Sequence, residues 1–290
     1  MKPVTRTVLE FLLGFVIVLL VSALLAPWIY SLFPFKFDRI LRRLIMIGTL
    51  FLVWGLVRSR RESLGRLGLV WGSRSLPQFG MGFLGGALLV AAITVIQWRM
   101  GVRFWKLSGV DLWHWIGFFI KGFGAGALIG VLEEFFFRGF LFLTLKDLWN
   151  NRVSLVVTNL IYALVHFFPK GHFSMGAQPT VVDSFRLLRS AVMPSGEIFL
   201  RMAPAVIGLF LFGLILSFLF LRTKSLYASI GLHAGAVFGL KLNRRFLSEI
   251  WERMGLFSGT KNLYDGIAGI LVLAFFAAAA GLWTRRRTSS

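Results

Sequence analysis

The chain has 290 residues, of which 57% are hydrophobic and 31 are Phe. This composition excludes a soluble globular protein, because several apolar runs approach or exceed the length that crosses a bilayer. The net charge of +20 comes from Lys and Arg between the apolar runs, where they meet lipid headgroups and fix orientation. We therefore predict an all-α, polytopic integral membrane bundle that contacts membrane lipids and binds no nucleic acid.

Apolar segments divide the chain into about eight expected transmembrane helices. The first, residues 8–26, is long for the core of a signal peptide, and Pro27 would follow any cut after Ala26, so we interpret it as a span. The helix over 115–148 is too long for one simple crossing, and we expect it to tilt, to bend at its glycines or to emerge after Arg138. The other expected spans are 42–57, 79–98, 152–168, 200–221, 225–241 and 264–283.

Three polar segments separate these spans. Residues 58–78 form a basic loop, and residues 169–198, the longest polar interval, are interpreted as a lid, an amphipathic surface helix or a mobile substrate-entry loop. Residues 243–256 are typical of an interfacial amphipathic helix. The chain shows no internal repeat. We expect residues 1–290 to form a single multi-pass domain in the cell (plasma) membrane.

Glu133, Glu134 and Arg138 stand out because they lie in a run that is otherwise glycine, aliphatic and phenylalanine. Charged groups in hydrocarbon are expensive, so they mark a pathway or a reaction centre and require partners. Helical spacing places Glu134 and Arg138 one turn apart as an ion pair. The same i, i+4 row contains the glycines at 122, 126 and 130, which allow another helix to approach closely.

Glu133 projects about 100° away from that row, and its own helix supplies no cation. A carboxylate without an internal counter-charge is suited to accept a proton. His166 and His233 lie on two other expected spans. One buried His is usually a packed core residue, but two of them with an unpaired Glu favour one shared site.

Two chemistries fit these three residues. In the first, Glu133 is the general base for a water molecule that His166 holds, and His233 donates a hydrogen bond to a developing oxyanion. In the second, Glu133, His166 and His233 bind a zinc ion that acidifies the water. The spacing leaves both open, because the three residues lie on separate helices. The chain has no Cys and no Gly-x-Ser-x-Gly sequence, which removes thiolate chemistry and weakens a serine mechanism.

The pattern resembles the CPBP family, which contains CAAX prenyl proteases and bacteriocin-processing or immunity (Abi) intramembrane proteases. The resemblance rests on Glu-Glu-x-x-x-Arg at 133–138, an aromatic residue four before His166, and His233 on a later span, and it covers residues 115–241. It implies an endopeptidase that cleaves a membrane-associated protein or peptide. By position, Glu133 would be the catalytic glutamate, Glu134 and Arg138 its supporting pair, His166 the water-activating histidine and His233 the oxyanion-side histidine.

Two residues depart from the family pattern. Tyr162 replaces the usual Phe and retains the ring, so it is a further supporting residue that offers a hydroxyl. Val237 stands where a polar residue usually follows His233 by four, and a lost oxyanion donor costs about 10²–10³ in turnover. Asn159, Asn243 or a backbone N–H are the possible substitutes. We predict a metal-free glutamate protease without a cofactor, with zinc as the alternative cofactor. The alternative functions are a weak or inactive immunity or partner-binding protein and, ranked lowest, a proton-coupled transporter.

Overall fold

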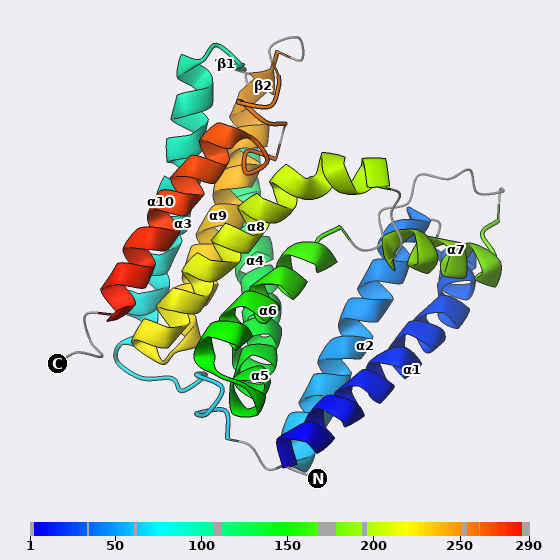
Figure 1. Cartoon of the computed structure of the whole chain (residues 1–290). Helices are drawn as coiled ribbons and strands as arrows, with labels where there is room; N and C mark the ends of the chain where they lie inside the picture. The colour runs from blue at the N-terminus through cyan, green and yellow to red at the C-terminus, as the bar shows by residue number, and fades with distance from the viewer. Residues whose placement is uncertain are drawn as a thin grey trace.

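A computed structural model describes residues 3–33, 35–60, 63–106, 112–167, 178–192, 196–250, 254–260 and 262–285. It confirms the all-α prediction, with a single pair of three-residue strands among the described residues (Figure 1). In chain order the elements are α1 (Pro3–Leu32), α2 (Phe37–Ser59), α3 (Ser75–Arg99), β1 (Arg103–Trp105), α4 (Leu112–Glu134), the π-helix η1 (Phe135–Phe142), α5 (Leu143–Leu148), α6 (Asn151–Val165), α7 (Val181–Val192), α8 (Gly196–Thr223), α9 (Leu226–Phe246), β2 (Leu247–Glu249) and α10 (Ile267–Arg285).

Six stretches of described helix are long and apolar enough to cross a membrane. They lie in α1, α2, α3, the continuous segment from α4 to α5, α8 and α10. The chain is therefore an integral, multi-pass membrane protein, but the predicted count of eight spans is not reproduced. The segment predicted at 152–168 forms α6, which has only 15 residues against the roughly 20 that a full crossing needs.

The segment predicted at 225–241 forms α9, which other helices bury. Gly82 and Gly86 of α3 pack directly on the α9 backbone, and Gly231 and Gly235 of α9 pack on the α3 backbone, so a Cβ at any of these positions would overlap main-chain atoms. Such contacts need small residues on both helices. Because protein rather than lipid surrounds α9, it can carry glycine and polar residues that a lipid-facing helix would exclude.

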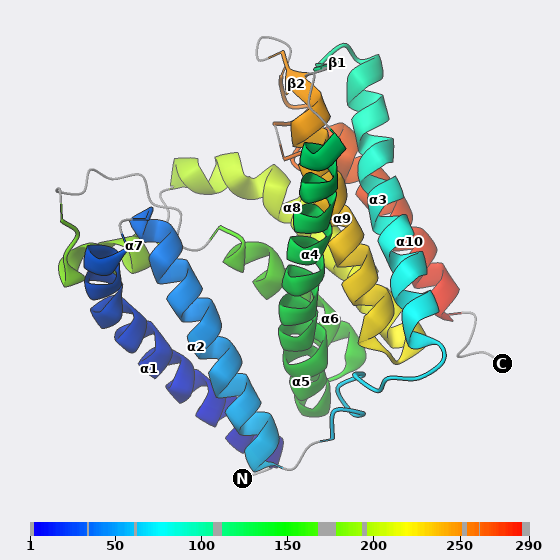
Figure 2. The same ribbon diagram turned by 180° about the vertical axis from the view of Figure 1, so that it is seen from behind.

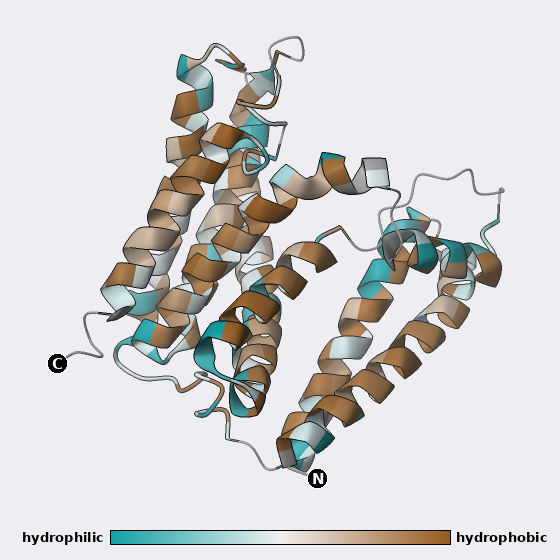
Figure 3. Cartoon of the chain, viewed as in Figure 1, coloured by the Kyte–Doolittle hydropathy of each residue, from teal (hydrophilic) through white to brown (hydrophobic). Residues whose placement is uncertain are grey.

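The helices form two groups that lie side by side. Helices α1 and α2 pair with each other and carry α7 across one end, next to the larger group of α3, α4, α8, α9 and α10 (Figures 1 and 2). The ring of Phe11 in α1 lies 5.4 Å from that of Phe140 in η1 and connects the two groups. Hydrophobic residues follow the length of α1, α8 and α10, and polar residues gather towards the helix ends (Figure 3), as expected for a bundle surrounded by lipid.

The amphipathic helix predicted over 243–256 is wrong. Helix α9 ends at Phe246, and the next three residues form β2, which pairs antiparallel with β1. The cause is a tertiary contact, because the buried guanidinium of Arg103 in β1 donates to Asn243 at 2.8 Å and to Glu249 at 3.2 Å. In the predicted interval 169–198, residues 181–192 form the amphipathic helix α7, while residues 169–177 and 193–195 lie outside the described chain.

Candidate active site

The carboxylates lie where α4 meets α9. A Cβ on Gly126 would stand 2.7 Å from the Ala234 carbonyl oxygen, and one on Gly130 would stand 2.9 Å from that of Ile230. The glycine row therefore allows the two backbones to touch, as its spacing predicts. This approach brings the last turn of α4 next to His233. Directly after Glu134 the helix changes to the π-helix η1, a rare geometry that occurs frequently at functional sites.

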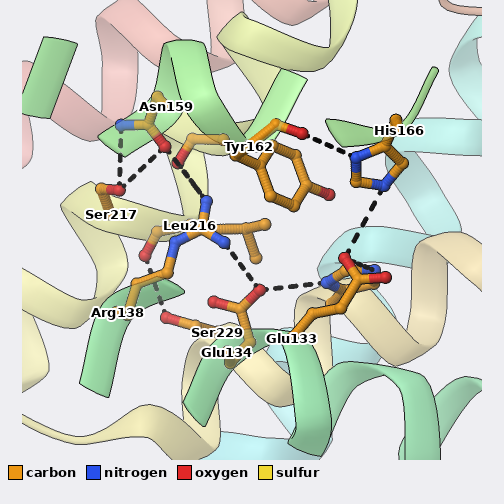
Figure 4. A network of polar contacts seen from close by, with 11 residues as sticks. Glu133, Glu134, Arg138, Asn159, Tyr162, His166, Leu216, Ser217 and Ser229 are labelled. Atoms are coloured by element: carbon orange, nitrogen blue, oxygen red, sulfur yellow. Dashed lines mark hydrogen bonds and ion pairs between the residues drawn. The ribbon is translucent and has the colours of Figure 1, made fainter. Parts of the chain in front are cut away.

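Glu134 and Arg138 form a fully buried ion pair at 3.0 Å, with no exposed side-chain surface. Arg138 also donates to the Asn159 side-chain oxygen at 3.1 Å (Figure 4). Arg138 donates a further hydrogen bond of 2.9 Å to the Gly213 carbonyl. Its guanidinium lies over the Tyr162 ring, 4.7 Å from the centroid. A buried ion pair is tolerated only when further hydrogen bonds satisfy both charges. This network joins η1 to α6 and α8.

His233 occupies the space between the two glutamates. Its Nδ1 lies 3.0 Å from Oε1 of Glu134, and its Nε2 lies 3.7 Å from Oε2 of Glu133. Because Oε1 of Glu134 accepts from Arg138, we assign the donated proton of this contact to Nδ1 of His233. In a neutral ring this leaves a lone pair on Nε2, on the side of Glu133.

His166 follows the last residue of α6, and its ring is fixed in the same way. Its Nδ1 lies 2.7 Å from the Tyr162 carbonyl oxygen, which can only accept, so Nδ1 donates. The Tyr162 ring packs against the imidazole at a centroid distance of 4.5 Å. Nε2 of His166 lies 3.6 Å from Oε2 of Glu133. Both histidines therefore direct Nε2 towards the same carboxylate oxygen.

Glu133 is the partly accessible member of the group. Its side chain is 25% exposed, yet its Oε2 is buried and accepts no hydrogen bond from the described residues. The distances to the two histidines are too long for direct hydrogen bonds. The oxygen therefore has room to accept a hydrogen bond from a water molecule or a substrate. The structure thus brings Glu133, His166 and His233 together from three separate helices.

A cavity of about 200 Å³ extends from these three residues. Val237 lies in its wall, one turn after His233 on α9. Arg244, Asn262 and Tyr264 contribute a second polar region, and the remaining lining is mostly apolar: Leu89, Val90, Ile93, Ile129, Leu209, Phe212, Ala236, Leu240, Leu263 and Leu273. The reacting groups therefore face a narrow space that opens among apolar side chains.

The two asparagines that we considered as oxyanion donors have other roles. The amide nitrogen of Asn159 donates to the Leu155 carbonyl and to Ser217, and its oxygen accepts from Arg138. Asn243 donates to Thr94 and accepts from Arg103. Both side chains are committed to the packing of helices, so the expectation that either replaces a donor at Val237 is wrong.

Sequence reasoning missed the second polar region of the cavity. The sequence places Arg244 in an expected interfacial helix and Tyr264 at the start of the last expected span, and it gives Asn262 no role. One signal was available for Arg244, which follows His233 by eleven residues and therefore returns to nearly the same face of a helix. No comparable signal exists for Asn262 and Tyr264, since they belong to an irregular loop before α10.

A zinc ion would require three ligands that converge on one point. Each histidine offers an Nε2 lone pair, but the described residues contain no set of three His, Asp or Glu side chains arranged to hold a metal. Catalysis without a metal stays a prediction, and so does the alternative of a zinc ion held by Glu133, His166 and His233. We write the chemistry below with the residues of the chain alone.

Comparison with known protein families gives a match over part of the chain. Residues 112–239 match the family model described as type II CAAX prenyl endopeptidase Rce1-like, a segment that holds the carboxylates and both histidines. No curated protein and no solved structure gives a significant match to the chain. This segment is similar to the Rce1-like family, and the similarity supports a CAAX-type intramembrane protease fold.

Proposed function

We propose that the chain is an endopeptidase that hydrolyses a peptide bond of a membrane-associated protein or peptide, with Glu133 as the general base. The observation that carries this proposal is the position of Glu133 Oε2 between Nε2 of His166 and Nε2 of His233, at 3.6 and 3.7 Å. The similarity of residues 112–239 to the Rce1-like family model supports the reaction class. The cell membrane, with its lipids as partners, remains our proposal for the location.

The fixed tautomers suggest how water is held. Nε2 of His166 accepts one hydrogen of the water, and Oε2 of Glu133 accepts the other, which leaves an oxygen lone pair free to attack the scissile carbonyl carbon. Glu133 removes the proton as the carbon–oxygen bond forms. It then returns the proton to the amide nitrogen as the carbon–nitrogen bond breaks, so the products are a carboxylic acid and an amine.

His233 lies on the side where the oxyanion would develop. In its protonated form it donates from both nitrogens, from Nδ1 to Glu134 and from Nε2 to the oxyanion. Glu134 and Arg138 fix the ring and are positioning residues in this scheme. Val237 supplies no polar group to the cavity, so His233 is the side-chain donor that this mechanism uses.

The deciding experiment compares wild type with Glu133→Gln in proteoliposomes, using a mass-spectrometric assay of lipidated peptides that include prenylated ones. We expect the substitution to lower cleavage by about 10²–10⁴-fold, the range for removing a general base, without a change in thermal stability. Glu10→Gln is the matched control, because Glu10 pairs with Arg6 and Arg60 on the surface of α1. Equal cleavage by Glu133→Gln and wild type would remove Glu133 from the base role.

Val237 supports one second function, a non-catalytic immunity or partner-binding protein on the same scaffold. It lines the cavity, at the position where the CPBP pattern usually has a polar residue. That function predicts that Glu133→Gln and His166→Ala leave biological activity intact. Loss of activity in both variants, with normal folding, would exclude it.

A further inference from the structure

The hydroxyl of Tyr162 has no part in the hydrolysis proposed above, although it meets the reacting groups. Tyr162 lines the cavity together with Glu133, His166 and His233. Among the described residues its hydroxyl has no hydrogen-bond partner, and its oxygen is not one of the fully buried side-chain atoms that lack a partner. Since only 1% of the residue is exposed, the little accessible surface that remains includes this oxygen.

Neighbouring side chains hold the Tyr162 ring in one position. The Arg138 guanidinium lies over the ring, 4.7 Å from its centroid, and the Phe137 ring packs edge-on at 5.0 Å. Gly213 of α8 leaves room for the ring, because a Cβ there would stand 3.1 Å from Cδ1 of Tyr162. A group that is fixed before the substrate arrives needs no ordering during the reaction, which is the condition for an effective hydrogen-bond donor.

The Tyr162 ring stands between the two imidazoles. Its centroid lies 4.5 Å from that of His166 and 6.3 Å from that of His233. The hydroxyl lies on the side of His166 and Glu133 and points away from Asn159 (Figure 4). The phenol O–H therefore faces the space around Oε2 of Glu133.

The proposed scheme leaves one role open for a phenol, which carries its proton at neutral pH and can donate a hydrogen bond. The attacking water is already held by two acceptors. The carbonyl oxygen gains negative charge during the attack and needs donors, of which His233 supplies one and Val237 none. The two departures from the CPBP pattern are thus complementary, because Val237 removes a polar group from the cavity and Tyr162 adds one.

We propose that the Tyr162 hydroxyl is a second donor to the oxyanion and takes the place of the polar group that Val237 lacks. The inference rests on the proposed function and adds a catalytic residue to it. When water attacks, the π electron pair of the carbonyl moves to its oxygen, which accepts hydrogen bonds from Oη of Tyr162 and Nε2 of His233. Both donors keep their protons, since the proton of the water passes to Glu133 and then to the departing amide nitrogen. The carbonyl forms again as the carbon–nitrogen bond breaks.

The test is Tyr162→Phe, which removes only the oxygen and keeps the ring on which Arg138 packs, so we expect normal folding. In the proteoliposome cleavage assay kcat should fall by about 10²–10³-fold, the effect of a lost oxyanion donor, with KM unchanged. The matched control is Tyr30→Phe. The Tyr30 ring packs against Phe37 at 6.0 Å, outside the cavity lining, so this variant should cleave at the wild-type rate.

Two further measurements separate an oxyanion donor from a structural residue. Val237→Asn offers a new donor, so it should raise kcat by a larger factor in Tyr162→Phe than in wild type, and Val237→Leu should raise kcat in neither. The acid limb of the pH profile of kcat should stay in place in Tyr162→Phe, because Tyr162 acts on the oxyanion. A shift of that limb to higher pH would show that the phenol stabilises the Glu133 carboxylate instead, which would overturn the inference.

A binding experiment tests the donor without turnover. N-acetyl-leucyl-leucyl-leucinal forms a tetrahedral hydrate in water, whereas the corresponding alcohol does not, and both suit the mostly apolar lining. By calorimetry on the full chain in dodecyl maltoside micelles, wild type and Tyr30→Phe should bind the aldehyde at least about ten times more tightly than the alcohol. Tyr162→Phe should lose most of this preference. Equal binding of both compounds to wild type, no binding of either, or an unchanged preference in Tyr162→Phe would overturn the inference.

The outcome is separable from that of the hydrolase proposal. An unchanged kcat in Tyr162→Phe, combined with loss of cleavage in Glu133→Gln, would refute the phenol as a donor and leave the hydrolase standing. Full cleavage by Glu133→Gln, combined with a lower kcat in Tyr162→Phe, would refute the base and keep the donor. If wild type cleaved no peptide, the proposed function would fail, and binding of the aldehyde would still decide whether Tyr162 holds a tetrahedral centre.

Discussion

Replacement of Arg138 by Leu tests whether the buried pair holds the site together. The wild-type guanidinium has no exposed surface and donates to Glu134, Asn159 and Gly213. Leu fills part of the volume but leaves the Glu134 carboxylate buried with only His233 beside it. Breaking one partner of a buried pair costs about 3–5 kcal/mol, which lowers the folding equilibrium constant by about two to three and a half powers of ten.

The measurement is equilibrium unfolding in mixed micelles, followed by Trp fluorescence as the mole fraction of dodecyl sulfate rises. Arg152→Leu is the control, because Arg152 is an exposed cation at the start of α6. In Glu134→Leu/Arg138→Leu both charges are absent, so we expect the double variant to lose less stability than the sum of the single variants. An unchanged midpoint for Arg138→Leu, or strict additivity, would show that the pair does not stabilise the fold.

The remaining predictions concern turnover. If the oxyanion site lacks a donor at Val237, then Val237→Asn should raise kcat by up to about 10², and the control Val237→Leu should not. A kcat of Val237→Asn no higher than that of wild type would contradict the missing-donor explanation. If the reaction needs only the residues of the chain, cleavage should be unaffected by 1,10-phenanthroline. Inhibition by this chelator that added zinc reverses would instead support Glu133, His166 and His233 as metal ligands.

The site was predictable from sequence wherever the signal was local to one helix. The i, i+4 spacing of Glu134 and Arg138, and of the glycines before them, depends only on helical geometry. Glu133, His166 and His233 are recognisable as candidate site residues because polar groups are costly in hydrocarbon. Their roles in catalysis stay predictions until the variants are assayed.

Other features depend on contacts between segments that are far apart in the sequence. The residues of α9 alone do not show whether the helix faces lipid or protein. Its glycines permit close packing, but only the structure shows that the backbone of α3 lies against them. The strand at 247–249 forms because Arg103, far away in sequence, needs buried partners. The second polar region likewise exists only because the loop before α10 brings Asn262 and Tyr264 to the cavity that Arg244 lines.

The sequence by itself determined that this is a membrane protein and which polar side chains are out of place in it, because composition and helical periodicity are properties of each segment alone. Only the tertiary structure decided which helix is enclosed by protein, where α9 ends, and how each imidazole is held. Those outcomes depend on buried hydrogen bonds between segments, and a buried polar group takes whichever partner the packing of the helices provides.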